Sequence, residues 1–208
     1  MKKYAFIHIP KNAGYTLRQA MTDHPDFEAY DHGVIFKNIP KNLKQIIVQR
    51  NPTDRFTSAF FYIKKLYVKD SKYLNPEMLI TGILNGERET NLFLRPQPHF
   101  HGVNGNKIPT DWVFHPQSAW LDNPYKIILM ENIKQEFLEL GLDIGEIRVN
   151  ASKRKDFTYS KNSLQYLWRI YEKDYLLYNY LKKDNNDESN HNWSDRSRWE
   201  PSSRPAPW

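Results

Sequence analysis

A short segment near the start of the chain combines the residue types that bind a phosphate group. Residues 8–17 read His-Ile-Pro-Lys-Asn-Ala-Gly-Tyr-Thr-Leu and overlap an apolar run, residues 4–9, that predicts a buried strand. A strand, a tight turn and the first turn of a helix together present free main-chain N–H groups to an anion. Lys11 adds a positive charge and Thr16 a hydroxyl. The segment therefore predicts a phosphate-binding turn.

This turn differs from the phosphate loop of nucleoside triphosphatases. The pattern Gly-x4-Gly-Lys-[Ser/Thr] is absent, and Lys11 precedes Gly14 instead of following a glycine. An ordinary strand-to-helix turn with a solvated lysine is the competing interpretation of the segment taken alone.

A second segment with the same kind of chemistry begins at Arg50. It follows a predicted buried strand, residues 45–49, and ligands of α/β proteins bind at the carboxyl ends of such strands. Asn51 and Pro52 are typical of a helix N-cap and of the first helical position, so we expect a helix to begin here.

On that helix, Arg55, Ser58 and Tyr62 share one flank, because residues three, four and seven positions apart are neighbours on a helix surface. A guanidinium together with a hydroxyl suits a phosphate monoester. The alternative is that Arg50 and Arg55 form ion pairs with acids such as Asp54.

The rest of the chain predicts a single α/β domain. Helical spacing of apolar residues follows the first turn, and a third strand at residues 126–130 precedes another helical pattern. Strand and helix alternate, which predicts a mostly parallel sheet with helices on both faces. Residues 85–120 have weak periodicity and suggest a functional loop region.

The domain is expected to cover residues 1–183. Residues 184–208 are rich in Asp, Asn, Ser, Arg and Pro and predict a disordered polar tail, although three tryptophans there leave a docking role open (Trp193, Trp199, Trp208).

Composition narrows the function further. The net charge of +6 favours an anionic partner, and the absence of cysteine excludes disulfides, cysteine nucleophiles and thiolate metal sites. No stretch has the length and apolarity of a signal peptide or a membrane span, so we expect a cytoplasmic protein that does not bind a membrane.

The two phosphate segments together resemble the sulfotransferase family that uses 3′-phosphoadenosine 5′-phosphosulfate (PAPS). The first is similar to its 5′-phosphosulfate loop, His-Ile-Pro-Lys-x-x-Gly-x-[Ser/Thr]-Leu. The second is similar to its 3′-phosphate motif, Arg-[Asn/Asp]-Pro-x-x-Arg-x-x-Ser-x-[Phe/Tyr]-[Phe/Tyr]. One departure is Tyr15, which stands where the family has a small residue. The resemblance implies a P-loop-like α/β fold.

Later segments resemble the carbohydrate branch that includes heparan and dermatan sulfate 2-O-sulfotransferases. They are a Pro-Gln-x-x-[Tyr/Trp]-Leu stretch at residues 116–121, a strand ending in Glu-Asn at residues 128–132, Asn-x-Ser at residues 150–152, and Tyr-x-x-Asp-Tyr at residues 171–175. The similarity covers residues 4–182 and implies that the acceptor is a glycan or another hydroxyl compound.

The resemblance also implies a role for each motif residue. Lys11 would stabilise the leaving phosphate as charge builds on it. The loop residues would contact the 5′-phosphate, Arg50 and Ser58 would hold the 3′-phosphate, and two later basic residues would close over the cofactor. The expected cofactor contacts are Lys11, Asn12, Ala13, Gly14, Tyr15, Thr16, Arg50, Ser58, Lys153 and Arg154.

The acceptor hydroxyl needs a general base, and the resemblance points to His32. Its surroundings, residues 30–34, are similar to the region that holds the catalytic histidine of the 2-O branch, and a histidine pKa of about 6.5 suits a base at neutral pH. The alternatives are Asp31, Glu28 or one of two histidines in the long loop, His99 and His101. No third ligand follows those two at a fixed spacing, so we expect no metal.

Two other function classes remain as alternatives. A P-loop nucleotide kinase shares the strand–loop–helix start, but the chain lacks Gly-Lys-[Ser/Thr] and an obvious metal-binding acid after a buried strand. A non-enzymatic basic module would bind polyanions in a salt-sensitive way without any cofactor. We expect no nucleic-acid partner, and the sequence does not indicate an oligomeric state.

Overall fold

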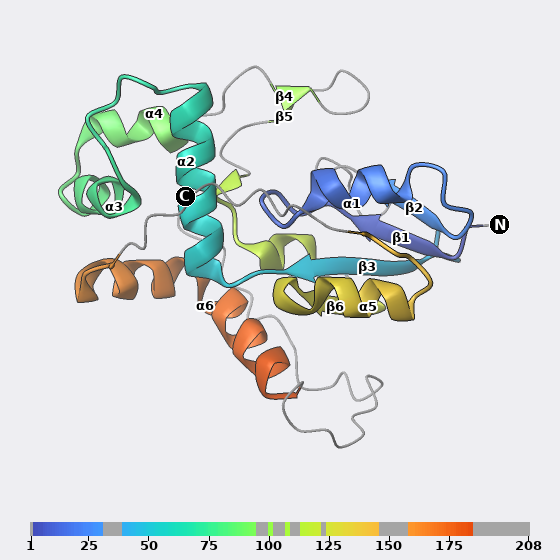
Figure 1. Ribbon diagram of the computed structural model, residues 1–208. Helices are drawn as coiled ribbons and strands as arrows, with labels where there is room; N and C mark the ends of the chain where they lie inside the picture. The colour runs from blue at the N-terminus through green and yellow to red at the C-terminus, as the bar shows by residue number, and fades with distance from the viewer. Residues whose placement is uncertain are drawn as a thin grey trace.

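Four parallel strands form the sheet that the alternating pattern predicts (Figure 1). The computed structural model describes residues 2–30, 39–94, 100–101, 107–108, 113–121, 124–145 and 158–184, with the main chain only at residues 100, 101, 107, 108 and 184. The strand order is β2-β1-β3-β6, with bounds β1 Tyr4–Ile7, β2 Phe27–Tyr30, β3 Lys44–Gln49 and β6 Lys126–Leu129. All three pairings are parallel, which confirms the predicted α/β class.

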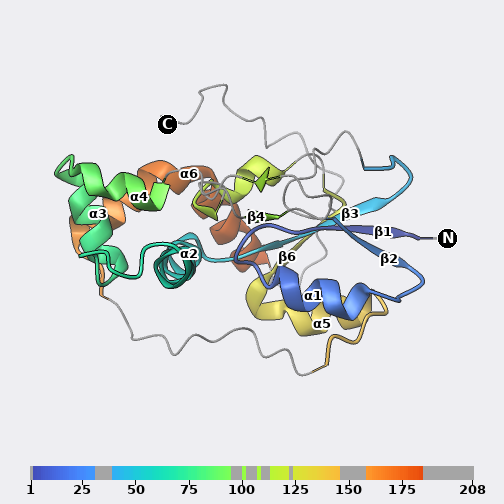
Figure 2. The same cartoon turned by 90° about the horizontal axis from the view of Figure 1, so that it is seen from above.

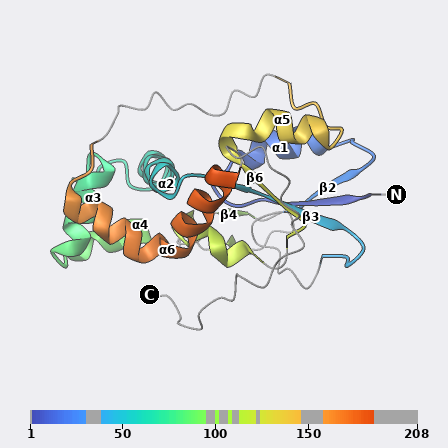
Figure 3. The same cartoon turned by 90° about the horizontal axis from the view of Figure 1, so that it is seen from below.

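Alternate residues of the strands supply two hydrophobic layers, as the period of two in a strand requires. One layer packs under α1 and α5, which lie side by side on one face of the sheet (Figures 2 and 3). The other layer is covered by the short helix η4 and the second half of α6. The bounds are α1 Gly14–Met21, α5 Ile133–Glu139, η4 Gln117–Trp120 and α6 Lys161–Asp184.

A second hydrophobic core lies among helices beside the carboxyl ends of the strands (Figure 1). The first half of α6 packs there with α2, Pro52–Leu66, α3, Pro76–Leu84, and α4, Asn91–Leu94. The apolar stripe predicted for α2 is buried in this core (Phe56, Ala59, Phe60, Ile63). Phe60 stacks on Phe93 of α4 with 5.2 Å between the ring centres.

The start of α2 follows from its sequence. The Asn51 side-chain oxygen accepts hydrogen bonds from the main-chain N–H of Thr53 at 3.0 Å and of Asp54 at 3.3 Å, and Pro52 begins the helix. These contacts confirm the predicted cap. They also fix the direction in which α2 leaves β3, and therefore the placement of the residues on its flanks.

Several elements differ from the sequence expectation. The first strand ends at Ile7 because the turn begins early: the N–H of Asn12 donates to the carbonyl of Ile9. The edge strand β2 and helix α3 were not predicted. The region of residues 85–120 holds η2 Arg88–Thr90, α4, η4 and a two-stranded ladder of β4 Phe100–His101 and β5 Lys107–Ile108.

The expected polar tail lies outside the described residues except for Asp184, whose main chain ends α6. Within the described part of the chain, no helix has both the length and the apolar character needed to cross a bilayer.

Candidate functional site

The two phosphate segments follow neighbouring strands at a switch point of the sheet. From β1 the chain crosses to β2 on one side, and β3 lies on the other side of β1 and leads on towards β6. The connections after β1 and β3 therefore diverge, and α/β proteins bind ligands in the crevice that such divergence opens at the carboxyl ends. The first segment follows β1 and the second follows β3.

The turn after β1 has an unusual backbone. Lys11 and Ala13 both adopt the left-handed conformation, with φ of 70° and 59°, which is uncommon outside glycine. Ala13 is followed directly by helical residues, and a left-handed residue next to a right-handed one turns consecutive N–H groups toward one point, as in an anion-binding nest. The backbone of this turn thus has the geometry that an anion requires.

The first turn of α1 also lacks a side-chain cap. Ala13 stands at the N-cap and offers no acceptor, whereas α2 and α3 each begin with an asparagine that accepts from their first N–H groups. No acidic residue lies in the first turn of α1. Its N-terminal N–H groups and the positive end of its dipole are therefore available to an anion.

A glycine is required at position 14 because a neighbouring side chain lies very close to its Cα, and not because of its backbone torsion angles. A Cβ atom at this position would lie 1.7 Å from Cδ2 and 2.0 Å from Nε2 of His8. The imidazole of His8 therefore occupies the space beside the turn where any other residue would place its side chain.

We expect Gly14→Ala to destabilise the protein by about 1–3 kcal/mol, because an added methyl group must displace the ring. Equilibrium urea unfolding would measure the change. The double variant His8→Ala/Gly14→Ala should regain most of the loss, since it removes the ring atoms that clash. A Gly14→Ala protein as stable as the wild type would contradict this account of the turn.

A direct hydrogen bond joins the two segments. Nη1 of Arg50 donates to the main-chain carbonyl of Lys11 at 2.9 Å. Arg50 is only 7% exposed, so its guanidinium lies between the end of β3 and the turn after β1. The two predicted phosphate-binding segments are consequently adjacent in space.

Arg55 holds the same turn from α2. Its Nε donates to the carbonyl of Pro10 at 3.0 Å and its Nη1 to the carbonyl of His115 at 2.6 Å. The side chain is 1% exposed, and its Nη2 has no hydrogen-bond partner. Burial lowers the pKa of this guanidinium, against the opposing charge of Asp174. Arg55 thus bonds main-chain carbonyls, where pairing with Asp54 was the alternative expectation.

The flank of α2 predicted to carry Arg55, Ser58 and Tyr62 faces the turn. Arg55 bonds Pro10, and the ammonium of Lys11 lies 4.1 Å from the ring centre of Tyr62, one turn after Ser58. Ser58 is half-buried and lies between Arg55 and Tyr62 on the same flank of α2. It therefore lies on the α2 surface next to the turn.

The electrostatics of Lys11 are unusual for a lysine. Burial, together with the nearby positive charge of Arg55, lowers its pKa to about 8. Near neutral pH the side chain is thus protonated but carries a charge that its surroundings disfavour. An anion bound at this point would relieve that cost, because an opposite charge favours the protonated form.

The side chain of Asn12 forms hydrogen bonds within the protein. Its Nδ2 donates to the carbonyl of Val48 and to Oε1 of Gln117, both at 2.6 Å, and the side chain is 1% exposed. Its N–H is used within the turn. Only the oxygen Oδ1 is unpartnered, and an acceptor offers nothing to a phosphate. We therefore assign Asn12 to holding the turn, where the sequence indicated a cofactor contact.

Gln117 connects both segments, and sequence reasoning did not place it in the site. Its side-chain amide pairs with the main chain of Arg50, accepting from the N–H at 2.9 Å and donating to the carbonyl at 2.8 Å. Its own N–H, like that of Ser118, donates to the carboxylate of Asp174 on α6. Gln117 and Asp174 are both fully buried. In the sequence they belong to the Pro-Gln stretch and the Tyr-x-x-Asp-Tyr stretch, which were the signals that could have identified them.

The departure at Tyr15 lies on the outside of the turn. The side chain is 68% exposed, and its hydroxyl accepts from the Nε2 of Gln19 on the next turn of α1. The large side chain therefore leaves the N–H groups of the turn uncovered. Thr16 follows it in the first turn of α1 and is half-buried.

The other predicted residues fall outside the described part of the chain. These are the expected base His32, its alternatives Asp31 and His99, and the basic residues Lys153 and Arg154; for His101 only the main chain is described. Glu28, the remaining alternative, lies exposed on β2, where it contributes with burial to raising the pKa of Tyr30 to about 12.

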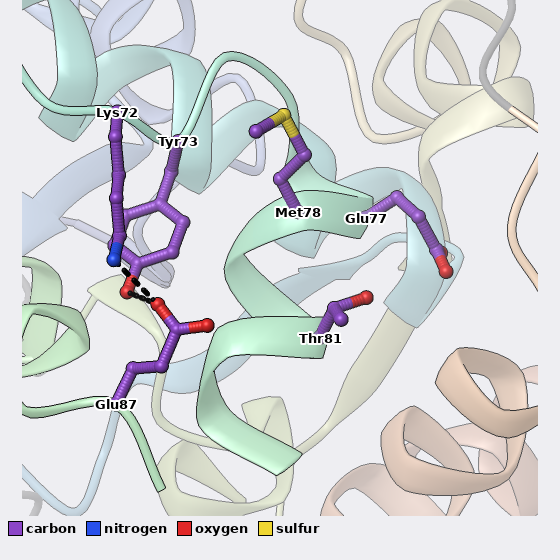
Figure 4. A pocket seen from close by; sticks show the side chains of 6 residues that line it. All are labelled: Lys72, Tyr73, Glu77, Met78, Thr81 and Glu87. Atoms are coloured by element: carbon purple, nitrogen blue, oxygen red, sulfur yellow. Dashed lines mark hydrogen bonds and ion pairs between the residues drawn. The ribbon is translucent and has the colours of Figure 1, made fainter. Parts of the chain in front are cut away.

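A hollow beside α3 is unconnected with this chemistry (Figure 4). It measures about 290 Å³ and is lined by Lys72, Tyr73, Glu77, Met78, Thr81 and Glu87, none of which belongs to either phosphate segment. Its central groups bind one another, since Glu87 accepts from Lys72 at 2.7 Å and from Tyr73 at 2.9 Å. Among the described residues no group of three potential metal ligands occurs.

Comparisons of this chain with protein-family models, with curated proteins and with solved structures found no match.

Proposed function

We propose that this chain is a sulfotransferase that uses PAPS as its donor and a hydroxyl group, on a carbohydrate or a related compound, as its acceptor. The observation that carries the proposal is the hydrogen bond between Arg50 and Lys11. It joins the two segments that are predicted to bind phosphate, at the carboxyl ends of β1 and β3. A donor with one phosphate at each end of its ribose needs two such segments at a short separation.

The first segment fits the 5′-phosphosulfate of the donor. The left-handed Ala13 and the uncapped start of α1 together leave a run of main-chain N–H donors. The N–H groups of Gly14, Tyr15 and Thr16 would donate to the 5′-phosphate.

The second segment fits the 3′-phosphate. One Nη1 bond of Arg50 is used by Lys11, and the remaining guanidinium N–H groups with the hydroxyl of Ser58 provide donors for a phosphate. Arg55, which is buried and bonded to two carbonyls, would hold the turn in place without touching the donor.

PAPS would supply an activated sulfonyl group for in-line transfer to the acceptor hydroxyl. Lys11 would neutralise the charge that develops on the departing phosphate, a role in which it counts more in the transition state than in the ground state. His32, which the sequence indicates as the base, would accept the proton of the acceptor hydroxyl on the opposite side.

Binding of 3′-phosphorylated nucleotide tests this proposal directly. The reaction product 3′-phosphoadenosine 5′-phosphate (PAP), at a hundred times its Kd, should stabilise the folded protein by about 2.7 kcal/mol through linkage. AMP lacks the 3′-phosphate and should stabilise it much less. A thermal-shift series with PAP, AMP, ADP and ATP would measure the difference.

Variants of the second segment sharpen that test. Ser58→Ala should reduce the shift from PAP while changing that from AMP little, and Arg50→Ala, which also removes the hydrogen bond to the Lys11 carbonyl, should reduce the shift from PAP more than that from AMP. Arg88→Ala, at an exposed arginine of η2, should change neither shift. Equal shifts from PAP and AMP would contradict the proposal that Arg50 and Ser58 bind a 3′-phosphate. A larger shift from ATP with Mg²⁺ would favour a kinase, and binding of heparin alone would favour a polyanion-binding module.

A further inference from the structure

The ammonium of Lys11 rests on an aromatic ring. Its Nζ lies 4.1 Å from the ring centre of Tyr62, well within the range of a cation–π interaction. Tyr62 projects from the flank of α2 that also carries Arg55 and Ser58, and both Lys11 and Tyr62 are half-buried. This contact links the tip of the turn after β1 to the middle of α2.

The attraction comes from the face of the ring and not from a phenolate. Burial raises the pKa of Tyr62 to about 12, so its hydroxyl stays protonated at neutral pH. The neutral ring still attracts a cation through its quadrupole, more strongly where water is partly excluded.

The contact between Lys11 and Tyr62 matters because other positive charges lie near the ammonium of Lys11. Arg55 lies close enough to lower the pKa of Lys11, and Arg50 bonds its carbonyl, so two guanidinium groups face the same turn. The charge of Arg55 repels the ammonium. Among the described residues of the turn and of the α2 flank that faces it, Tyr62 supplies an attraction that opposes this repulsion.

We propose that Tyr62 is a positioning residue that holds the Lys11 ammonium, in its protonated form, between α2 and the turn after β1. The proposal rests on the function proposed above, in which Lys11 stabilises the leaving phosphate. The ring of Tyr62 restricts the flexible side chain of Lys11 to one direction, with its ammonium between α2 and the turn. It also favours the charged state of Lys11, which burial and the charge of Arg55 disfavour.

The pKa of Lys11 in the free protein tests the contact without any substrate. Acylation of its amine by an excess of reagent, followed across pH by mass spectrometry of the peptide that contains Lys11, reports that pKa. Tyr62→Phe keeps the ring and should leave the pKa almost unchanged. Tyr62→Leu removes the ring and should lower it by about 0.5 to 1.

A fluorinated ring separates electrostatics from shape. Pentafluorophenylalanine at position 62 keeps an aromatic ring of similar shape but reverses the charge distribution of the ring face, so it should lower the pKa of Lys11 at least as much as Tyr62→Leu does. Tyr125→Leu is the matched control, because Lys44 lies 4.5 Å from the ring centre of Tyr125 on the far end of the sheet. That variant should leave Lys11 unchanged.

Kinetics then test the positioning role. Tyr62→Leu should lower kcat about 5- to 10-fold with the Kd for PAP changed less than twofold, and Tyr62→Phe should restore most of the rate. An equal pKa of Lys11 in the wild type, Tyr62→Leu and the fluorinated variant would overturn the role of Tyr62. A lowered pKa in a protein that binds neither PAP nor AMP would instead overturn the proposed function.

Discussion

Lys11→Ala should lower the kcat of sulfonyl transfer by about 100- to 1,000-fold while weakening PAP binding far less. The charge of Lys11 is needed mainly as the bond to the leaving phosphate breaks, so its removal costs more in the transition state than in the ground state. Steady-state kinetics with labelled PAPS, together with the Kd for PAP, would measure the two effects separately.

The pH dependence of the reaction gives an independent check on Lys11. Its pKa of about 8 in the free protein means that the charged form is lost as the pH rises through 8. Because kcat/KM reports the ionisation of the free enzyme, it should fall above about pH 8. Lys11→Arg keeps its charge at all these pH values, so any activity that it retains should show no such fall.

Two outcomes would contradict this role. If kcat and the affinity for PAP decreased together by the same modest factor, Lys11 would be a binding residue only. If Lys44→Ala, at an exposed lysine of β3, reduced kcat as much as Lys11→Ala, the effect would reflect the overall charge of the protein.

Local signals in the sequence account for the parts of the site that each segment builds alone. The cap of α2 required only Asn51 and Pro52, and the buried stripe of that helix required only its own spacing. The position of Arg50 at the end of β3 followed from the apolar run before it. Such features depend on neighbours within a few residues, so a sequence contains them in full.

Contacts between distant segments were beyond this kind of prediction. Gln117 binds Arg50 across 67 positions and Asn12 across 105, and no periodicity reports which amide will meet which main-chain group. The edge strand β2 was missed because it has four residues, Phe-Glu-Ala-Tyr, with only the first buried. The role of Arg55 was likewise decided by the fold, which places the carbonyl of Pro10 next to it.

The buried carboxylate of Asp174 is the point on which this long-range arrangement depends. Its two oxygens accept from the N–H groups of Gln117 at 2.6 Å and Ser118 at 2.7 Å, and the side chain is fully buried. Burial raises its pKa, while the positive charge of Arg55 and the two N–H donors lower it. The carboxylate thus positions Gln117, which in turn holds Arg50 and Asn12.

Asp174→Ala should therefore destabilise the protein by about 3–5 kcal/mol, since removing one member of a buried charge arrangement leaves the other charge uncompensated. The buried N–H of Gln117 and the partly buried N–H of Ser118 would also lose their acceptor. Urea unfolding would measure the loss. Glu172→Ala, two positions earlier at an exposed site on the same helix, should change stability by no more than about 0.5 kcal/mol.

A double-mutant cycle distinguishes the charge from the hydrogen bonds. In Arg55→Met the buried cation is replaced by an apolar side chain, so the further loss of Asp174 should cost less there than in the wild type, by about 0.5–3 kcal/mol. The remaining cost of Asp174→Ala in that background reflects the N–H groups of Gln117 and Ser118. Additive losses would mean that Arg55 and Asp174 are stabilised independently, and that the carboxylate acts through the N–H groups alone.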